Sequence, residues 1–546
     1  MLTRQHIYTL LIIVSAGLML GRIIAVNRTD TLLYQQYRFG EVNKRFNELE
    51  KELREANASE EELAEHATTR QQRLENERRE LPIFSANDRS RWNTLRVLVE
   101  PDLRVQRTVT DGTEKTETVW YAIDKAQNVR GWDTIDMVKH NNVAELAEQS
   151  FLTACQKEWT NLLASIGSIV RRDRAEKEEP LPIQSEGYLY SSKPPLLPTL
   201  MAVPYAIMYR ATDGKLSLEH EPFLVVRVML VVCNLLPLVF CWFLLSRLID
   251  RFGGTDWGRV FAMIFVCFGT FLSTFVVTLN NHLPGVVCVT IAFYCAVRIV
   301  YDQETRWRYF IGAGFFSAFA VACEIPALLF CAFVGLWLLC HQWKRTLSGF
   351  VPAALVVMAA FFATNYVAHK TILPAYSNQA WYFYEYERNG RTIQSYWQHP
   401  AGFDKGEPSR GNYIFHATIG HHGLFSLTPV WALSVIGLGC WLTHRRYWSM
   451  ATLILLMSVV VFLFYTLVLP EQQRNYGGNT SALRWMFWLA PLWSVALVAA
   501  ADWCSRKGFL RAIALACLAV SVMSVAYPVW NPWTVPWSYN LLEYLR

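Results

Sequence analysis

Residues 222–247, PFLVVRVMLVVCNLLPLVFCWFLLSR, decide the fold class of this chain. Only Arg227 interrupts the run before the closing Arg247, and the run exceeds the ~20 apolar residues that a helix needs to cross a bilayer. Val260–Thr278 and Ala451–Leu469 are similar runs. Because the 546 residues are 53% hydrophobic and only 18% charged, the composition also favours a membrane protein over a soluble enzyme.

The hydrophobic runs predict a polytopic α-helical membrane protein with about 11 transmembrane helices. The first, within residues 1–26, resembles a secretory signal, but no small-x-small cleavage site follows it, so we expect an uncleaved helix. The predicted spans are 7–26, 222–246, 259–279, 283–301, 309–324, 326–341, 349–368, 424–442, 449–469, 484–501 and 509–527.

The short loops between these spans alternate in charge. Every second loop is basic, whereas Asn280–His282 and Glu324–Pro326 hold no Lys or Arg. Since cytoplasmic loops are enriched in Lys and Arg, we expect the basic side and the N-terminus to be cytoplasmic. The basic side holds Arg4, Arg247, Arg251, Arg259, Arg306, Arg308, Lys344, Arg345, Arg445, Arg446, Arg506, Lys507 and Arg511. The net charge of +6 therefore indicates topology, and we expect no nucleic-acid partner.

The same alternation requires that residues 195–209 do not cross the membrane, although they are apolar. They are short and proline-punctuated, which favours an interfacial or re-entrant helix. Residues 27–221 then form one large extracytoplasmic α+β loop. The remaining divisions are a transmembrane core at 222–368, an extracytoplasmic loop at 369–423, C-terminal transmembrane helices at 424–527 and a tail at 528–546.

The large loop has several predicted parts. Residues 41–81 follow a heptad pattern interrupted by charges, which indicates a coiled-coil-like helix, an antiparallel hairpin or a solvated amphipathic helix. Residues 95–130, with a DG turn, predict a β-hairpin. Residues 143–172 are expected to be helical, and 173–183 to be a polar linker. Cys155 is the single cysteine of this loop, so no disulfide is expected within it.

Ionisable residues near the outer ends of the spans are the first candidates for a site, because charges in a membrane are costly. They are Arg227, His282, Glu324 and Arg484. The alternative for each is ordinary: an arginine can extend to lipid head groups, and His282 can cap a helix. Their common predicted side favours a shared function.

Several motifs on that side together resemble a known superfamily. NDRSRWNTLRVLVEPDLRV from Asn87 resembles the first extracytoplasmic loop of GT-C glycosyltransferases, and GYLYSSKPPLLPTLMAVPY from Gly187 resembles a segment of the bacterial lipid A aminoarabinose transferases. Protein O-mannosyltransferases have a comparable Pro-Pro helix. HHGLFSLTPVWAL from His421 and NYGGNTSALRWMFWLAPLW from Asn475 are similar to stretches of bacterial members.

The resemblance implies a GT-C-like membrane enzyme of the bacterial inner membrane that transfers a sugar from a polyprenyl-phosphate donor to a glycan, lipid or protein acceptor. It implies a catalytic segment at 85–105, with Asp88 as the catalytic acid that deprotonates or orients the acceptor hydroxyl. Lys193 matches the residue that binds the donor phosphate, and Arg227 is expected to share that task. Direct displacement with inversion is the implied mechanism.

The chain departs from the resemblance at Arg89, where many members have a second acid, and at Ser192, where some have a metal-binding Glu. Asp133 or Asp136 is a candidate second carboxylate; the alternative is a helix cap and a surface charge. Arg91 is a further accessory candidate. No metal-ligand spacing stands out, and a divalent metal cofactor stays open.

Two other functions compete with the transferase. A GT-C-like scaffold without catalysis would explain the missing second acid. A transporter or flippase would show internal repeats with matching broken helices, and no such symmetry is found.

Overall fold

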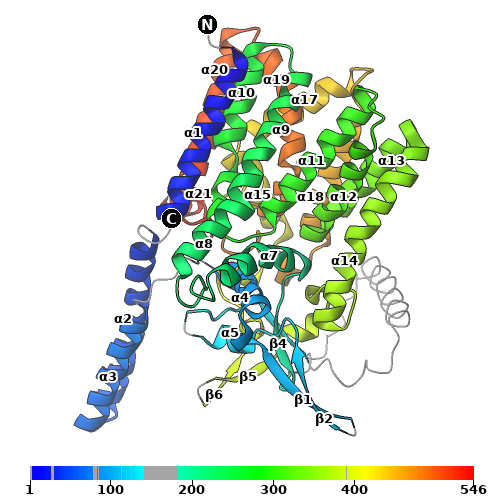
Figure 1. Cartoon of the computed structure of the whole chain (residues 1–546). Helices are drawn as coiled ribbons and strands as arrows, with labels where there is room; N and C mark the ends of the chain where they lie inside the picture. The colour runs from blue at the N-terminus through cyan, green and yellow to red at the C-terminus, as the bar shows by residue number, and fades with distance from the viewer. Residues whose placement is uncertain are drawn as a thin grey trace.

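The computed structural model describes residues 3–25, 30–77, 83, 85–111, 113–129, 131–140, 183–388 and 390–545. Most of these residues are helical. A bundle of long helices forms the body, and shorter helices and strands gather at one end of it (Figure 1).

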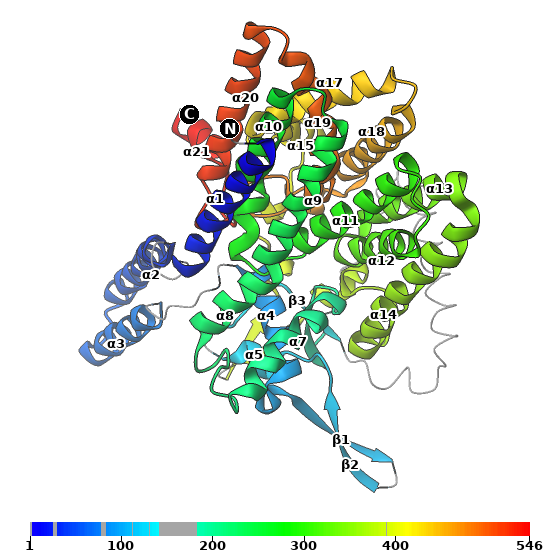
Figure 2. The same ribbon diagram turned by 45° about the horizontal axis from the view of Figure 1, so that its top comes forward.

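The bundle is built from the apolar runs that the sequence shows. Its helices are α1 (Arg4–Ala25), α8 (Pro222–Leu230), α9 (Leu236–Phe252), α10 (Asp256–Ile264), α11 (His282–Tyr301), α12 (Trp307–Cys323), α13 (Leu328–Arg345), α14 (Val351–His369), α17 (Val430–Leu442), α18 (Trp448–Leu463), α19 (Ala490–Cys504) and α20 (Gly508–Ala526). The core of the bundle lies around α11, which packs against α9, α12 and α19. Figure 2 shows the same helices from another side.

Eight helical segments of the described chain are long and apolar enough to cross a membrane. One of them, Ile325–His369, is broken at Gln342, whose φ of −146° is not helical, and it comprises both α13 and α14. Two shorter apolar helices, α12 and α17, accompany the eight. The protein is therefore a polytopic α-helical membrane protein, and the count of 11 spans stays a prediction.

The basic loops meet at one end of the bundle, as their alternation in the sequence requires. The contacts that join these loops are Arg4–Asp250 at 2.9 Å, Arg251–Asp302 at 2.5 Å, Thr255–Asp502 at 2.8 Å, Gln342–Glu304 at 3.4 Å and the Tyr301–Tyr447 ring pair at 5.8 Å. The loops without Lys or Arg lie at the opposite end. The cytoplasmic assignment of the basic end stays a prediction from the charge rule.

At the non-basic end, helices α4 (Ala86–Val99), α5 (Asp124–Asn128) and α7 (Leu196–Ala211) accompany three two-stranded antiparallel sheets. The sheets pair β1 (Val105–Asp111) with β2 (Thr113–Val119), β3 (Met137–His140) with β4 (Tyr188–Ser191), and β5 (Glu385–Arg388) with β6 (Arg391–Gln394). The β3–β4 pair joins segments on either side of residues 141–182. This pairing brings Asp136 next to Lys193.

The predicted β-hairpin is correct in kind but too long. Its strands cover residues 105–119, whereas the expected range began at 95. Residues 95–99 continue α4 instead, and both Leu95 and Val97, which point to opposite sides of that helix, are buried. The sequence of a helix that is buried on all sides has no amphipathic periodicity, so its pattern does not predict a helix.

Helix α7 lies across the end of the bundle and packs along α4 (Figure 1). The Tyr205 hydroxyl donates to Glu100 Oε1 at 2.6 Å and accepts the backbone N–H of Leu218 at 2.9 Å. The segment after α7 therefore stays near the end of α4 rather than emerging at the basic end. The interfacial position of residues 195–209 stays a prediction.

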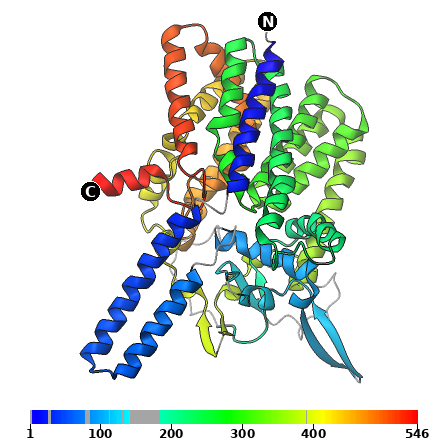
Figure 3. The same ribbon diagram turned by 60° about the vertical axis from the view of Figure 1, so that its left-hand side comes forward.

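The heptad-patterned segment forms two helices, α2 (Asp30–Glu55) and α3 (Glu60–Glu77), that lie side by side. Asn57, with a φ of +56°, lies in the turn between them, and Arg70 donates to Asn43 across the pair. Figure 3 shows this hairpin, an arm that extends away from the bundle. The predicted helix at 143–172 and most of the predicted linker at 173–183 lie outside the described residues.

Three further helices complete the non-basic end: α15 (Arg410–Thr418), α16 (Leu424–Leu427) and α21 (Trp537–Leu545). The span predicted at 424–442 is therefore interrupted, since α16 ends at Leu427 and α17 begins only after Pro429. Proline at that position cannot donate a helical hydrogen bond, which explains the break.

Candidate functional site

Helices α4, α5 and α7 and the three sheets at the non-basic end are called the end domain below. The first turn of α4 places Asp88 at the interface between this end domain and the bundle. Ser85 caps the helix by accepting the backbone N–H of Asp88 at 3.2 Å. The Asp88 carboxylate accepts the backbone N–H of Leu279 at 2.9 Å, and the residue is only 1% exposed. Its position near a helix N-terminus stabilises a negative charge.

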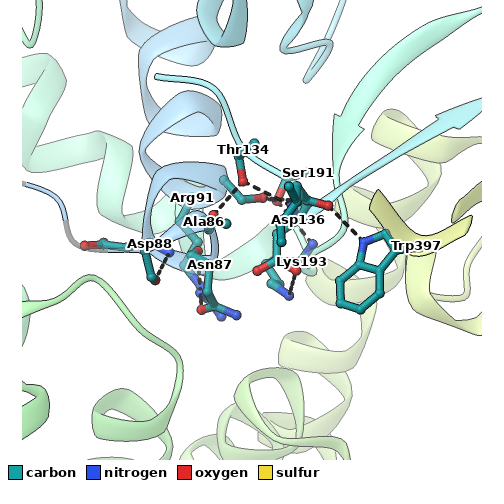
Figure 4. A network of polar contacts seen from close by, with 12 residues as sticks. Ala86, Asn87, Asp88, Arg91, Thr134, Asp136, Ser191, Lys193 and Trp397 are labelled. Carbon is teal, nitrogen blue, oxygen red and sulfur yellow. Dashed lines mark hydrogen bonds and ion pairs between the residues drawn. The ribbon is translucent and has the colours of Figure 1, made fainter. Parts of the chain in front are cut away.

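Lys193 lies beside the same turn, held by an ion pair. Its Nζ is 3.0 Å from Asp136 Oδ1, and the two side chains are 20% and 14% exposed (Figure 4). The Ser90 hydroxyl donates to the backbone carbonyl of Asp136 at 2.6 Å and lies 2.6 Å from the Ser191 hydroxyl. These bonds join α4, the segment before β3 and the end of β4 into one unit.

A chain of polar contacts leads from Arg91 across the bundle end to Arg484. Arg91 donates to the Asn281 side chain, which donates to Glu324 Oε1 at 2.7 Å. Glu324 contacts Nδ1 of His282, and Nε2 of His282 lies 2.9 Å from the Arg484 guanidinium. Since Arg484 can only donate and the Glu324 carboxylate accepts, a neutral His282 protonated at Nδ1 satisfies both contacts.

The cations of the site interact with one another as well as with the acids. Burial lowers the pKa of Lys193 below its usual range, the Asp136 carboxylate opposes that shift, and the charges of Arg91 and Arg484 add to it. Burial also lowers the pKa of Arg91, to about 10. The three cations therefore share one site with the carboxylates of Asp88, Asp136 and Glu324 and interact with them.

One comparison with known proteins supports a function for this arrangement. Residues 202–367 match the family model described as dolichyl-phosphate-mannose-protein mannosyltransferase. The chain is a GT-C glycosyltransferase-like membrane protein. No curated protein and no solved structure matches the chain.

The match covers the bundle side of this GT-C-like site. It runs from α7 to α14 and includes His282 and Glu324, whereas Asp88, Lys193 and Arg484 lie outside it. The end domain and the C-terminal helices therefore supply much of the site from segments that the match does not reach.

Seven of the residues singled out from the sequence come together in this network. They are Asp88, Arg91, Asp136, Lys193, His282, Glu324 and Arg484. Their roles were assigned from the sequence and stay predictions. The gathering itself is a property of the GT-C-like fold, since these residues come from six separate segments.

Two other predicted residues lie differently. Asp133 is at the edge of the site, with a side chain that is 53% exposed and 3.9 Å from Arg89. Arg227 lies in α8 with its guanidinium 5.8 Å from the centre of the Phe223 ring, and its convergence on Asp88 and Lys193 stays a prediction. Asp136 is neither a helix cap nor a surface charge, so that alternative is wrong for it.

Sequence reasoning missed two residues that border the network. Asn281 bridges Arg91 and Glu324, and Asp404 lies 3.1 Å from the Tyr396 hydroxyl and 3.3 Å from the Asn475 amide. Burial raises the pKa of Asp404 above its usual value. The available signal was the shared outer location predicted for loops 369–423 and 470–484.

Among the described residues, no group of three or more His, Cys, Asp or Glu side chains could hold a metal ion. The rings of His421 and His422 contact each other. Both residues are distant in the sequence from Asp88 and Lys193. The metal dependence of the GT-C-like protein stays untested.

Proposed function

We propose that the protein transfers a sugar from a polyprenyl-phosphate donor to an acceptor hydroxyl at the extracytoplasmic face of the bacterial inner membrane. The observation that carries this proposal is the position of a buried carboxylate, Asp88, in one site with the cations Arg91, Lys193 and Arg484. The site lies at the end of the bundle opposite the basic loops, which supports the extracytoplasmic assignment.

The transfer needs a base and a charge-stabilising site, and we assign these roles to Asp88 and Lys193. The acceptor O–H gives its proton to the Asp88 carboxylate, and the acceptor oxygen forms a bond to the anomeric carbon. The bond from that carbon to the phosphate oxygen breaks, and its electron pair stays on the leaving polyprenyl phosphate. Attack from the face opposite the phosphate inverts the anomeric configuration.

Lys193 stabilises the negative charge that develops on the leaving phosphate, and Arg227 is the predicted second phosphate ligand. In the free protein Asp136 holds the Lys193 ammonium at 3.0 Å. A bound phosphate would share this ammonium with Asp136, so the cation is in position before the donor arrives. Such preorganised charges stabilise a transition state without further rearrangement.

Arg484 and Arg91 are oriented by contacts that leave them little freedom. Arg484 Nε donates to the Gly477 carbonyl at 2.9 Å, and Arg91 Nη1 donates to the Asn87 carbonyl at 3.0 Å. We assign both a supporting role in neutralising the phosphate. Glu324 and His282 hold Arg484 from the other side and act as positioning residues.

The experiment is a donor assay with the purified full-length protein in nanodiscs. Radiolabelled polyprenyl-phosphate sugars that differ in the sugar are supplied with membrane extract as acceptor source, and release of polyprenyl phosphate is measured. We expect one donor to react and Lys193→Ala to slow its release by roughly 100-fold. The matched control is Lys125→Ala, an exposed lysine of the same end domain.

Absence of release from every donor would refute the transferase. The scaffold alternative has one observation in its favour: Arg89, at the position of the missing acid, donates to the Asp133 carbonyl at 2.8 Å. Donor binding without any turnover by the wild type would establish that scaffold.

A further inference from the structure

A cavity lies beside the network and is lined by C-terminal segments of the non-basic end. Its volume is about 290 Å³, close to the lower limit of ordinary small-molecule sites. Its lining residues come from α15, α21 and the turns at 402–407 and 476–478. The side chains that matter to its chemistry are Phe403, Glu407, His416, His421, Tyr476 and Tyr539.

Flat rings form the walls of this cavity. The Tyr539 ring centre is 5.2 Å from that of Phe403 and 5.4 Å from that of His421. His416 stacks on His421 at 3.9 Å, and Tyr476 lies 5.0 Å from His421. Four different segments contribute these rings, so the cavity depends on the complete fold. The partly exposed rings, Phe403 and Tyr539, are of the kind that packs against the C–H face of a sugar ring.

Acidic groups border the same cavity. Glu407 is half-buried, and its backbone N–H donates to the Arg474 carbonyl at 2.9 Å, which fixes its place. Glu543 lines the cavity from α21. Carboxylates accept hydrogen bonds from hydroxyl groups, so rings and acids together match a polyhydroxylated ring.

A strained turn ties the cavity to the network. Tyr476 has a φ of +57°, and Gly477 and Gly478 follow with +94° and +81°. A left-handed conformation is uncommon for tyrosine and is retained where the surroundings enforce it. The turn places the Tyr476 ring in the cavity wall and the Gly477 carbonyl on Arg484.

The segment Gly402–Lys405 makes a second connection. Phe403 lines the cavity, whereas the next side chain, Asp404, contacts Asn475 and Tyr396 on the side of the network. The Asp404 charge interacts with Asp136 and Arg484. Adjacent residues of one segment therefore contact the cavity, through Phe403, and interact with the proposed phosphate site, through Asp404.

We propose that this cavity is a saccharide-binding subsite that holds the acceptor, which would make the acceptor a glycan or a glycosylated molecule. The inference that a saccharide binds depends only on the cavity, whereas the inferred acceptor role rests on the proposed function. The size suits about one or two sugar rings. A lipid tail offers no hydroxyl group to Glu407 or Glu543, and an extended peptide would exceed the volume.

The test is saturation-transfer-difference NMR on the full-length protein in nanodiscs, with methyl glycosides of glucose, galactose, mannose and N-acetylglucosamine as probes. We expect at least one to bind, and Tyr539→Ala to weaken it by roughly tenfold. The matched control is Tyr544→Ala, a tyrosine on the same helix that is 87% exposed. Glu407→Gln, which keeps the shape of the side chain, is the second variant in case Tyr539→Ala fails to fold.

Lack of binding by all glycosides, or equal binding by wild type, Tyr539→Ala and Glu407→Gln, overturns the subsite. Binding of basic peptides in place of glycosides overturns it in favour of a peptide acceptor.

The acceptor role has its own readout. Tyr539→Ala is expected to raise the acceptor KM by roughly tenfold with little change in kcat, and Lys193→Ala to lower turnover while glycoside binding persists. A protein that binds glycosides but consumes no polyprenyl-phosphate donor would refute the transferase alone. An unchanged acceptor KM in Tyr539→Ala would refute the acceptor role alone.

Discussion

The ion pair between Lys193 and Asp136 offers a quantitative test of the site. At 3.0 Å, two unit charges attract by about 5 kcal/mol at an effective dielectric constant near 20. Desolvation of both groups and their partial exposure, 20% and 14%, reduce the coupling to about 2 kcal/mol. We therefore expect Asp136→Asn and Lys193→Met each to lower the free energy of unfolding by about 3 kcal/mol, because each leaves one charge behind.

The double variant is expected to lose about 2 kcal/mol less than the sum of the single losses. The assay is equilibrium unfolding of the purified protein in mixed micelles, followed by tryptophan fluorescence. The control cycle uses Arg107 and Glu117, a pair at 3.1 Å on the β1–β2 hairpin whose side chains are 24% and 41% exposed. That pair should couple by less than about 1 kcal/mol. Additive losses for Lys193 and Asp136, within the control value, would refute the pairing.

Three other variants test separate features. Gly477→Ala should lower both the rate of sugar transfer and the stability, because Gly477 has a φ of +94° and the new Cβ would lie 3.1 Å from Arg484 Nε. Transfer activity and melting temperature measure these effects, and wild-type values for both would contradict the prediction. Burial raises the pKa of Asp124 from 3.8 to about 6, so the folded state keeps a proton that the unfolded chain loses. The free energy of unfolding should therefore fall by about 2 kcal/mol between pH 4 and 6. Asp124→Asn should remove that pH dependence in denaturation series, and an unchanged slope would contradict the assignment. Lys193 must be protonated to bind phosphate, and burial lowers its pKa. As the pH is raised, donor binding should therefore begin to decline at a lower pH than for an ordinary lysine, and Lys193→Arg should shift this decline to higher pH in a pH series of donor affinity. A decline at the same pH in Lys193→Arg would exclude Lys193 as the titrating group.

The sequence predicted the parts of the fold that local physics controls. Bilayer thickness requires long apolar runs, and charge alternation requires the basic loops to share one end, which the Arg4–Asp250 and Thr255–Asp502 contacts bear out geometrically. Alternating Thr and Val residues likewise predicted the strands of the β1–β2 hairpin. The errors fall where tertiary packing decides, as in α4, whose residues 95–99 are helical because they are buried on all sides.

The candidate site shows the same division. Asp88 and Lys193 carried recognisable local motifs, but the partner of Lys193 lies 57 residues away, at Asp136, and only the β3–β4 pairing brings the two together. Asp404 belongs to no motif, and its place beside Asn475 depends on two loops from different parts of the chain. Contacts of this kind depend on the whole fold and leave no periodic pattern in the sequence.

The most direct test of the proposed chemistry is a single-turnover measurement on Asp88→Asn with a reactive polyprenyl-phosphate sugar. The substitution keeps the size of the side chain and can still accept the Leu279 N–H, so we expect donor affinity within about threefold of wild type. Loss of the base should slow transfer to the acceptor by roughly 100- to 10,000-fold. Transfer by Asp88→Asn at the wild-type rate would contradict the account.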